Sequence, residues 1–188
     1  TEYHSIFSVN GSFFDKKFNP TGLIISDYQS IGKINPSNLS NGIFTINNKH
    51  VPYLYHSSIF ANLSKKQRND FEFAIQNGPI LLDQNGKTSI KKDTGNFAAR
   101  TAIGIDKNNN IIIIVIKQSI ENLGNQLTLF KFAKLLQDNQ IFHTLQLHSV
   151  LNLDGGPSTG FALNNFYLPE LTPIQNIIIT LPRSHEST

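Results

Sequence analysis

The stretch from Asn152 to Thr159 constrains this chain most, because it ends an apolar run with a carboxylate and two glycines. The apolar residues before it are typical of the end of a buried strand. Gly155 and Gly156 allow a sharp turn with positive φ angles that other residues resist. Asp154 at the strand end, beside backbone N–H groups, is suited to bind and transform a polar substrate. The alternative is an Asp-Gly turn without chemistry, since such turns are common.

Length and charge indicate a globular chain that does not bind nucleic acid. With 188 residues and 39% hydrophobic side chains, the chain can bury a sizeable core, and we expect one domain over residues 1–188 with a polar tail at 183–188. The formal charge of +3 and the isoelectric point near 9.1 are compatible with an anionic ligand. Lys and Arg are scattered and form no stripe interleaved with aromatic residues, so no nucleic-acid partner is expected.

Several site classes are excluded by what the sequence lacks. There is no Cys, which excludes disulfides, thiol catalysis and thiolate metal sites. Walker A and GxGxxG fingerprints are absent, so nucleotide-binding folds are not supported. No apolar stretch is long enough to span a bilayer, and the longest apolar run, at residues 111–116, is expected to be a buried strand. The sequence does not indicate the oligomeric state.

Short apolar runs bounded by turn residues predict a sheet-rich fold. Single strands are expected at residues 4–9, 23–25, 80–82, 142–153, 161–163 and 174–181. One hairpin is expected to join residues 42–46 to 51–54 across the pair Asn47-Asn48, and a second to join 100–105 to 111–116. Hairpins argue against a purely parallel sheet.

Two helices are expected beside these strands. Ser64 and Gln67 have the spacing of a capping box, and apolar residues follow at helical spacing, which predicts a helix over residues 65–76. Thr128 can cap a second helix over residues 129–138 with a wide apolar face. The predicted fold class is therefore α+β, with a mixed, mainly antiparallel sheet and two main helices packed on it.

Two further segments carry candidate site residues. The first strand leads into Asn10-Gly11-Ser12-Phe13-Phe14, where Asn10 supplies an amide, Gly11 permits an unusual backbone, and the two Phe can line a pocket. The alternative is a strand that turns and packs its Phe side chains into the core. Arg100 lies where a loop enters a strand, as either a surface residue or a cation at the rim of a pocket.

Three motifs together resemble the phosphodiester glycosidase family. They are NGSFF from Asn10, RTAIG from Arg100 and NLDGGPST from Asn152, in the order seen in that family. Gly-Ile-Phe at 42–44 and Gln-Asn-Gly-Pro at 76–79 are weaker matches, and the resemblance extends over about residues 4–163. Ser12 and Pro157 depart from the pattern, because the family usually has Gly at both positions.

The resemblance implies a hydrolase that cleaves the C1–O bond of a sugar 1-phosphodiester, of the N-acetylglucosamine type. The departing phosphate is stable as an anion, so a general acid is less needed than in ordinary glycoside hydrolysis, and one carboxylate suffices. Asp154 would be the general base or the nucleophile, Arg100 would hold the phosphate, and Asn10 would complete the catalytic set. The implied substrate-binding residues are Gly11, Ser12, Phe13, Phe14, Gln76, Thr101, Gly155, Gly156, Ser158 and Thr159.

The resemblance also bears on cofactors, partners and location. No metal ligands and no cofactor are predicted; a divalent cation near Asp154 is compatible with the sequence, but no ligand spacing indicates one. The expected partner is a sugar phosphate or phosphoglycan. Many bacterial members are secreted or periplasmic, so the resemblance implies export after removal of a signal peptide. The natural sugar, the group beyond the phosphate and the stereochemical outcome are left open.

Three other functions remain open at the level of sequence. A phosphodiesterase that cuts the P–O bond would normally need paired metal ions, and His143 and His148 have no acidic partner at ligand spacing. A binding module could recognise an envelope glycan or phosphoglycan without cleaving it. A structural envelope protein with a degenerate site is the third, although Asn10, Arg100 and Asp154 are all present.

Overall fold

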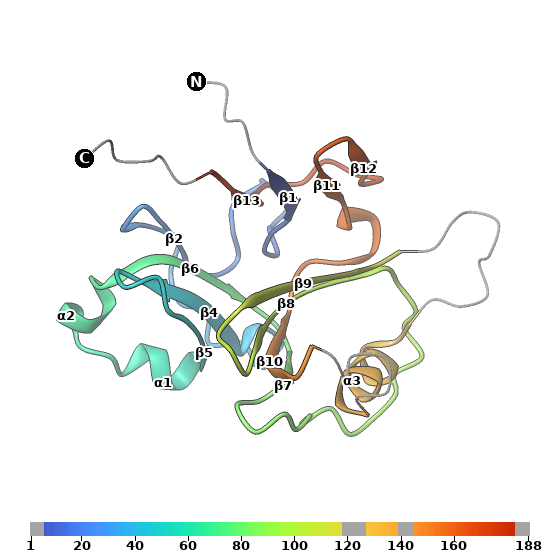
Figure 1. The fold of residues 1–188 in the computed structure, drawn as a ribbon, viewed down its shortest axis with the longest axis horizontal. Coiled ribbons are helices and arrows are strands. Elements are labelled where there is room, and N and C mark those ends of the chain that lie inside the picture. The colour runs from blue at the N-terminus through green and yellow to red at the C-terminus, as the bar shows by residue number, and fades with distance from the viewer. Residues whose placement is uncertain (1–5, 118–126, 139–144, 183–188) are drawn as a thin grey trace.

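The fold is three antiparallel sheets with a few helices, as the computed structural model shows for residues 6–117, 127–138 and 145–182 (Figure 1). Within these ranges every strand pair is antiparallel. The predicted α+β class is therefore confirmed. No helix in the described part of the chain is long and apolar enough to cross a membrane.

Two of the sheets pack face to face around a shared core. The five-stranded sheet has the order β3 (Gln29–Ile31), β2 (Ile24–Ser26), β6 (Phe71–Asn77), β4 (Gly42–Asn47) and β5 (Pro52–His56). The four-stranded sheet has the order β7 (Ile80–Leu82), β10 (Leu147–Asn152), β8 (Arg100–Asp106) and β9 (Ile111–Ile116). Phe44 and Ile75 of the first sheet meet Ile103, Leu151 and Leu153 from the second sheet and the turn after it. Burial of these side chains holds the two sheets together.

Helices cover the outer face of each of these two sheets. The helix α3 (Leu129–Gln137) packs Phe132 and Leu136 against Leu81 and Val150 of the four-stranded sheet. Its N-cap, Thr128, accepts a hydrogen bond from the Lys131 N–H, as predicted for this helix.

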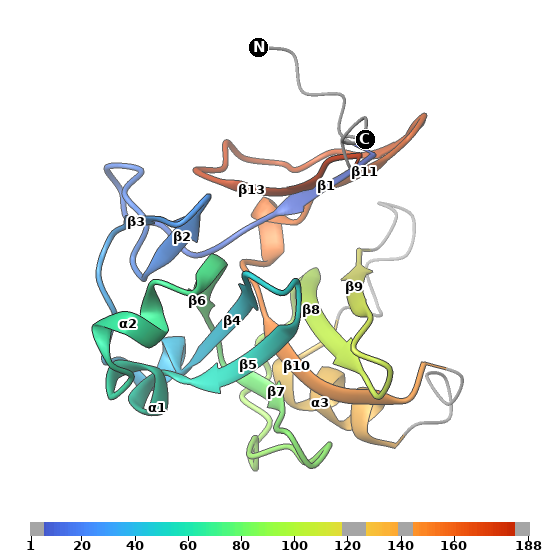
Figure 2. The same ribbon diagram turned by 60° about the vertical axis from the view of Figure 1, so that its left-hand side comes forward.

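The five-stranded sheet is covered by α1 (Ser57–Ala61), whose Phe60 lies among Leu23, Ile43 and Phe71. The result is two packed sheets between helices on opposite sides (Figure 2).

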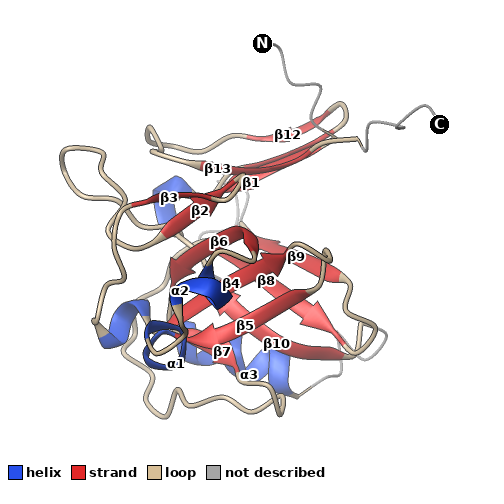
Figure 3. Cartoon of the chain, turned by 90° about the vertical axis from the view of Figure 1, so that its left-hand side faces the viewer, coloured by secondary structure: helices blue, strands red, loops and turns tan. Residues whose placement is uncertain are grey.

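The third sheet forms a separate layer above the other two (Figure 3). Its order is β12 (Phe166–Leu168), β11 (Phe161–Leu163), β1 (Phe7–Asn10) and β13 (Ile177–Thr180). The first strand of the chain thus lies between two of the last strands. The strand β1 ends at Asn10, and there the chain leaves this layer and continues toward the two packed sheets.

The predicted helix over residues 65–76 is wrong. Only α2 (Lys65–Arg68) is helical there, and its capping box between Ser64 and Gln67 is formed. From Phe71 the chain is the strand β6, which pairs with β2 on one side and β4 on the other. Burial on both faces gives this strand an apolar pattern that does not alternate, so helical spacing within it was accidental.

Both predicted hairpins are present, although the first has a longer loop than expected. Ile46 pairs with Pro52, so the connection spans residues 47–51 and is not a two-residue Asn-Asn turn. The Asn47 side chain accepts hydrogen bonds from the N–H groups of Lys49 and Val51, and His50 has a φ of 59°. The second hairpin joins β8 to β9 as predicted, and within it Arg100 pairs with Ile116.

The remaining predicted strands are all found, β7 and β11 with the predicted bounds and the others with shifted bounds. They are β1, β2, β7, β10, β11 and β13; residues 142–144 of the predicted strand at 142–153 and the tail at 183–188 lie outside the described residues. The elements β3, α1 and β12 were not predicted from the sequence. Each of them is only three to five residues long, which is too short for a periodic pattern.

Candidate active site

The three sequence motifs meet where β1 and β10 end and β8 begins. The Asn10 side chain is fully buried, and its Nδ2 donates to the Asp154 carbonyl oxygen at 2.7 Å. Its Oδ1 accepts from Thr101 Oγ1 at 2.8 Å and from the Gly160 N–H at 3.2 Å. One side chain therefore joins the NGSFF, RTAIG and NLDGGPST segments. Both polar atoms of Asn10 bond to the protein, and they hold the backbone of the Asp154 turn in place.

Backbone hydrogen bonds fix the turn that carries Asp154. The Asp154 N–H donates to the Gly11 carbonyl at 3.0 Å, and the Gly156 N–H donates to the Ala99 carbonyl at 2.8 Å. Gly156 has the expected positive φ, 61°, but Gly155 does not: its φ is −140°, which is extended backbone. Gly155 is required for space instead, because a Cβ there would lie 2.8 Å from the Ala99 carbonyl oxygen.

The Asp154 carboxyl group is partly buried, and burial raises its pKa above the ordinary value of 3.8. Hydrogen bonds from the Ser158 side chain and the Gly155 N–H oppose this rise, the latter to Oδ1 at 2.9 Å. Within the described residues Asp154 forms no ion pair with a cation. A carboxyl group held in this way can accept a proton or act as a nucleophile once it is ionised.

Arg100 is a buried cation at the start of β8, adjacent to Ala99, which bonds the Asp154 turn. Its side chain is held by backbone carbonyls, with Nε donating to Leu127 at 2.9 Å and Nη2 to Asn96 at 2.6 Å. Burial lowers its pKa, but an Arg side chain stays protonated in proteins. No described carboxylate pairs with it, and its Nη1 bonds to no described residue. The positive charge of Arg100 and its Nη1 donor suit an anionic ligand such as phosphate.

Lys117 is a second cation at this edge of the sheet, and it was not predicted. It follows β9 directly, and Arg100 pairs with its neighbour Ile116 across the hairpin. Its Nζ donates to the Thr159 carbonyl at 2.9 Å and to the Pro169 carbonyl. Burial lowers the pKa of Lys117, and Glu170 opposes this effect. A lysine that ends an apolar strand opposite Arg100 was the available signal in the sequence.

The predicted substrate-binding residues of the first motif are largely engaged with Asn176, another residue that the sequence did not single out. The Ser12 N–H donates to Asn176 Oδ1 at 2.8 Å, and Asn176 Nδ2 donates to Ser12 Oγ at 3.1 Å. A Cβ on Gly11 would lie 1.9 Å from Asn176 Oδ1, so glycine is needed for this close approach. Phe13 and Phe14 are half-buried, and Phe14 stacks on Phe18 at 5.3 Å.

Thr101, Thr159 and Ser158 are buried around the Asp154 turn. Thr101 Oγ1 bonds to Asn10, and it lies 3.4 Å from Thr159 Oγ1. The Ser158 side chain bonds to the Asp154 carboxyl group. These hydroxyls therefore support the turn from within.

Gln76 has no free polar atom. Its Oε1 accepts from the N–H groups of Leu23 and Asn35, and its Nε2 donates to the carbonyls of Asn35 and Ser40. The side chain is 2% exposed and ties β6 to the segments around residues 23, 35 and 40. The structure thus gives Gln76 a role in joining elements of the fold.

Two buried amide oxygens beside the turn have no hydrogen-bond partner among the described residues. They are Oδ1 of Asn77 and Oδ1 of Asn152. Asn152 Nδ2 donates to the carbonyls of Gly78 and Leu153, and Asn77 Nδ2 approaches the Gly11 carbonyl at 3.5 Å. Burying an acceptor without a donor is costly, so such oxygens are suited to accept from a ligand hydroxyl or an ordered water.

Two hollows of the described structure lie away from these residues. A cleft of about 970 Å³ between β13 and the packed sheets is lined mostly by apolar side chains, and a smaller pocket lies between β5 and β7. Neither is lined by Asn10, Arg100 or Asp154. Over the described ranges, no three His, Asp or Glu side chains gather in a way that could hold a metal ion.

Comparison with known proteins identifies the family. The sequence model of the phosphodiester glycosidase family matches residues 3–180. The catalytic domain of zebrafish N-acetylglucosamine-1-phosphodiester alpha-N-acetylglucosaminidase, auto-inhibited by its pro-peptide, is 24% identical with a TM-score of 0.65. A hypothetical protein from Synechocystis is 17% identical with a TM-score of 0.53.

These structures support the same fold, and the chain is shorter than both of them. The similarity covers 89% of this chain and 56% of the zebrafish chain, and 87% and 48% for the Synechocystis protein. The chain thus spans about half the length of these structures. No curated protein matches.

Proposed function

Because the chain belongs to the phosphodiester glycosidase family, we propose that it hydrolyses the C1–O bond of a sugar 1-phosphodiester, with N-acetylglucosamine as the sugar. The observation that carries this proposal is the network around Asn10, which joins the three family-like motifs at the turn whose Asp154 side chain is a partly buried carboxyl group. The zebrafish enzyme is named for a substrate of the same class. An exported location, in a cell envelope or outside it, belongs to the same proposal.

In this reaction Asp154 acts on the sugar and Arg100 on the phosphate. As general base, the Asp154 carboxylate takes a proton from water while the water oxygen bonds to C1; the C1–O electron pair leaves with the phosphate as a phosphomonoester. As nucleophile, Asp154 bonds to C1 first, and water then cleaves the ester. Both routes need the ionised carboxylate and produce the free sugar.

The cations at the sheet edge would stabilise the phosphate. Nη1 of Arg100, which bonds to no residue of the described ranges, would donate to it, and the Lys117 ammonium lies at the same edge. The N–H groups of Gly155 and Gly156 already donate to Asp154 and Ala99, so the backbone of the turn adds fewer donors than the sequence suggests. The oxygens of Asn77 and Asn152 are enclosed acceptors that an ordered water between them and the sugar would satisfy.

The second candidate function is a module that binds a phosphoglycan without cleaving it. The observation that favours it is that both polar atoms of Asn10 are bonded within the protein, so this residue of the expected catalytic set cannot also act on a substrate, whereas Arg100 can still hold a phosphate. A glycosidase would release free sugar, whereas a binding module would leave the phosphoglycan intact.

A turnover assay with N-acetylglucosamine 1-phosphodiesters tests the proposal. We expect wild type to release free sugar and Asp154→Asn to release none, while Asp106→Asn stays active. Asp106 is a suitable control because it is also buried and bonded, in the turn between β8 and β9. A chelator arm tests whether a metal takes part. Binding without sugar release by folded wild type would favour the module, and equal activity of Asp154→Asn would remove Asp154 from catalysis.

A further inference from the structure

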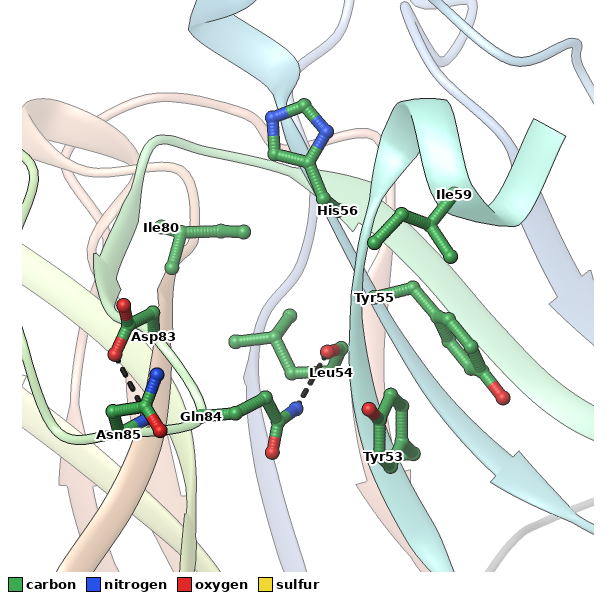
Figure 4. A pocket seen from close by; sticks show the side chains of 9 residues that line it. All are labelled: Tyr53, Leu54, Tyr55, His56, Ile59, Ile80, Asp83, Gln84 and Asn85. Atoms are coloured by element: carbon green, nitrogen blue, oxygen red, sulfur yellow. Dashed lines mark hydrogen bonds between the residues drawn. The ribbon is translucent and has the colours of Figure 1, made fainter. Parts of the chain in front are cut away.

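We propose that the pocket between β5 and the turn after β7 is a binding site for one neutral sugar ring, separate from the candidate active site. The pocket has a volume of about 280 Å³ and lies where the edge strand of the five-stranded sheet faces the edge strand of the four-stranded sheet (Figure 4). It shares no lining residue with the site around Asp154. It is thus a second, independent feature of the molecule.

Two tyrosines of β5 line one side of the pocket. Tyr53 and Tyr55 are on the same face of β5, with ring centroids 4.4 Å apart. Tyr55 is backed by edge contacts with Phe60 and Phe71 at 5.7 and 5.8 Å, so it is a fixed support. Tyr53 is 44% exposed although it is a large aromatic residue. An exposed ring held from behind offers a flat surface for the C–H face of a sugar.

In each of two polar side chains around the pocket, one polar atom is held by a hydrogen bond and the other bonds to no described residue. Gln84 Nε2 donates to the Leu54 carbonyl at 2.7 Å, which leaves Oε1 as an acceptor (Figure 4). Asp83 Oδ1 accepts from the N–H groups of Asn85 and Lys87, which leaves Oδ2. Such side chains are already ordered before a ligand arrives, so binding costs little conformational entropy.

His56 completes this polar group. Its Nδ1 contacts Ser58 Oγ at 2.8 Å and caps α1, so Nε2 remains for a ligand. The floor between the polar atoms is apolar, with Leu54, Ile59 and Ile80. An apolar floor with a few fixed polar atoms is the usual make-up of a small-molecule site.

The charges of the lining select the class of ligand. No Lys or Arg lines this pocket, and Asp83 contributes a carboxylate, so a phosphate or other anion is disfavoured. The open acceptors of Gln84 and Asp83 require donors from the ligand. A sugar ring supplies hydroxyl donors around its edge and C–H groups on its face. The two sites thus differ in ligand class: this pocket suits a neutral sugar ring, and the site at Arg100 suits an anion.

Titration of the labelled full chain with glucose, galactose, mannose and N-acetylglucosamine, followed by NMR, tests this inference. We expect at least one sugar to bind with an affinity in the order of millimolar, shifting the Gln84 side-chain amide signal. Tyr53→Ala should weaken this binding about tenfold, and Tyr53→Phe should retain it, because the ring makes the contact. Inorganic phosphate should not shift these signals.

Two control variants make the test specific. Tyr28→Ala removes another exposed tyrosine, outside the pocket, and should bind as wild type. Asp154→Asn should also bind as wild type at this pocket, so failure of the proposed catalytic function and failure of this inference are distinguishable. The inference is overturned if none of the sugars binds, if Tyr53→Ala binds as tightly as wild type, or if the shifts map only to residues around Asp154.

Discussion

At the scale of single residues, the partly buried carboxyl group of Asp154 makes the activity depend on pH in a defined direction. Burial raises its pKa above 3.8, and the reaction needs the ionised form. We therefore expect kcat/KM to rise with pH along an acidic limb whose midpoint lies above 3.8, measured as a pH–rate profile. A midpoint at or below 3.8 would show that another group controls the reaction.

The same raised pKa has a consequence for stability. The folded state binds the Asp154 proton more tightly than the unfolded chain does, so this contribution is complete below 3.8 and is lost as the pH rises through the raised pKa. Asp154→Asn cannot ionise and keeps an oxygen for the Gly155 N–H. At neutral pH we expect it to unfold at a urea concentration no lower than wild type does; a clearly lower midpoint would contradict this.

Arg100 is the second residue whose role can be separated from folding. Loss of one well-placed donor typically costs about 3 kcal/mol of transition-state stabilisation, so Arg100→Ala should lower kcat/KM about a hundredfold. Arg68→Ala is the matched control, because Arg68 also donates to two backbone carbonyls, those of Leu63 and Ala61, far along the chain from the motifs. Unchanged kinetics in folded Arg100→Ala would remove this residue from the site.

Sequence reasoning at this scale identified which residues gather, but not what each one does. The motifs around Asn10, Arg100 and Asp154 could be read from residue types and order, and the network of Asn10 brings them together. Lys117 could have been identified from the predicted hairpin, because it follows the strand that pairs with Arg100. Asn176 could not, because only the return of the chain after β12 brings it to the site. Long-range contacts of this kind leave no local pattern.

At the scale of elements, Gln76 is a joint between strands and loops. Its side chain makes four hydrogen bonds, two of them fully buried, so Gln76→Ala should lower the free energy of unfolding by about 3 kcal/mol. Gln67→Ala, which removes an exposed capping-box side chain, should cost less than about 1 kcal/mol. Urea denaturation measures both. A Gln76→Ala protein as stable as wild type would mean that the side chain is not the joint described.

The segment around Gln76 also shows where sequence periodicity fails. Ser64 and Gln67 do start a helix, but Arg68 ends it after one turn, and β6 follows from Phe71. The strand lies between β2 and β4, so tertiary pairing decides its structure over local propensity. The helix over residues 129–137, in contrast, could be predicted because its cap and its one apolar face agree.

At the scale of the whole molecule, the centre of the packed sheets should be the most stable part and the exposed edge strands the least stable. All seven residues of β8 are buried, and the strand is paired on both sides by β9 and β10. The residues of β3 are exposed at a sheet edge, and those of β12 are largely exposed at another. Hydrogen exchange should therefore be slowest in β8 and fastest in β3 and β12. Faster exchange in β8 than in β12 would contradict this order.

The most direct test is hydrolysis of an N-acetylglucosamine 1-phosphodiester in water labelled with heavy oxygen. If water attacks the sugar carbon with help from Asp154, the label enters the C1 hydroxyl of the released sugar and the phosphate stays unlabelled. Asp154→Asn should yield no labelled sugar. Label in the phosphate would instead show that the P–O bond is cut, and it would contradict a glycosidase centred on Asp154.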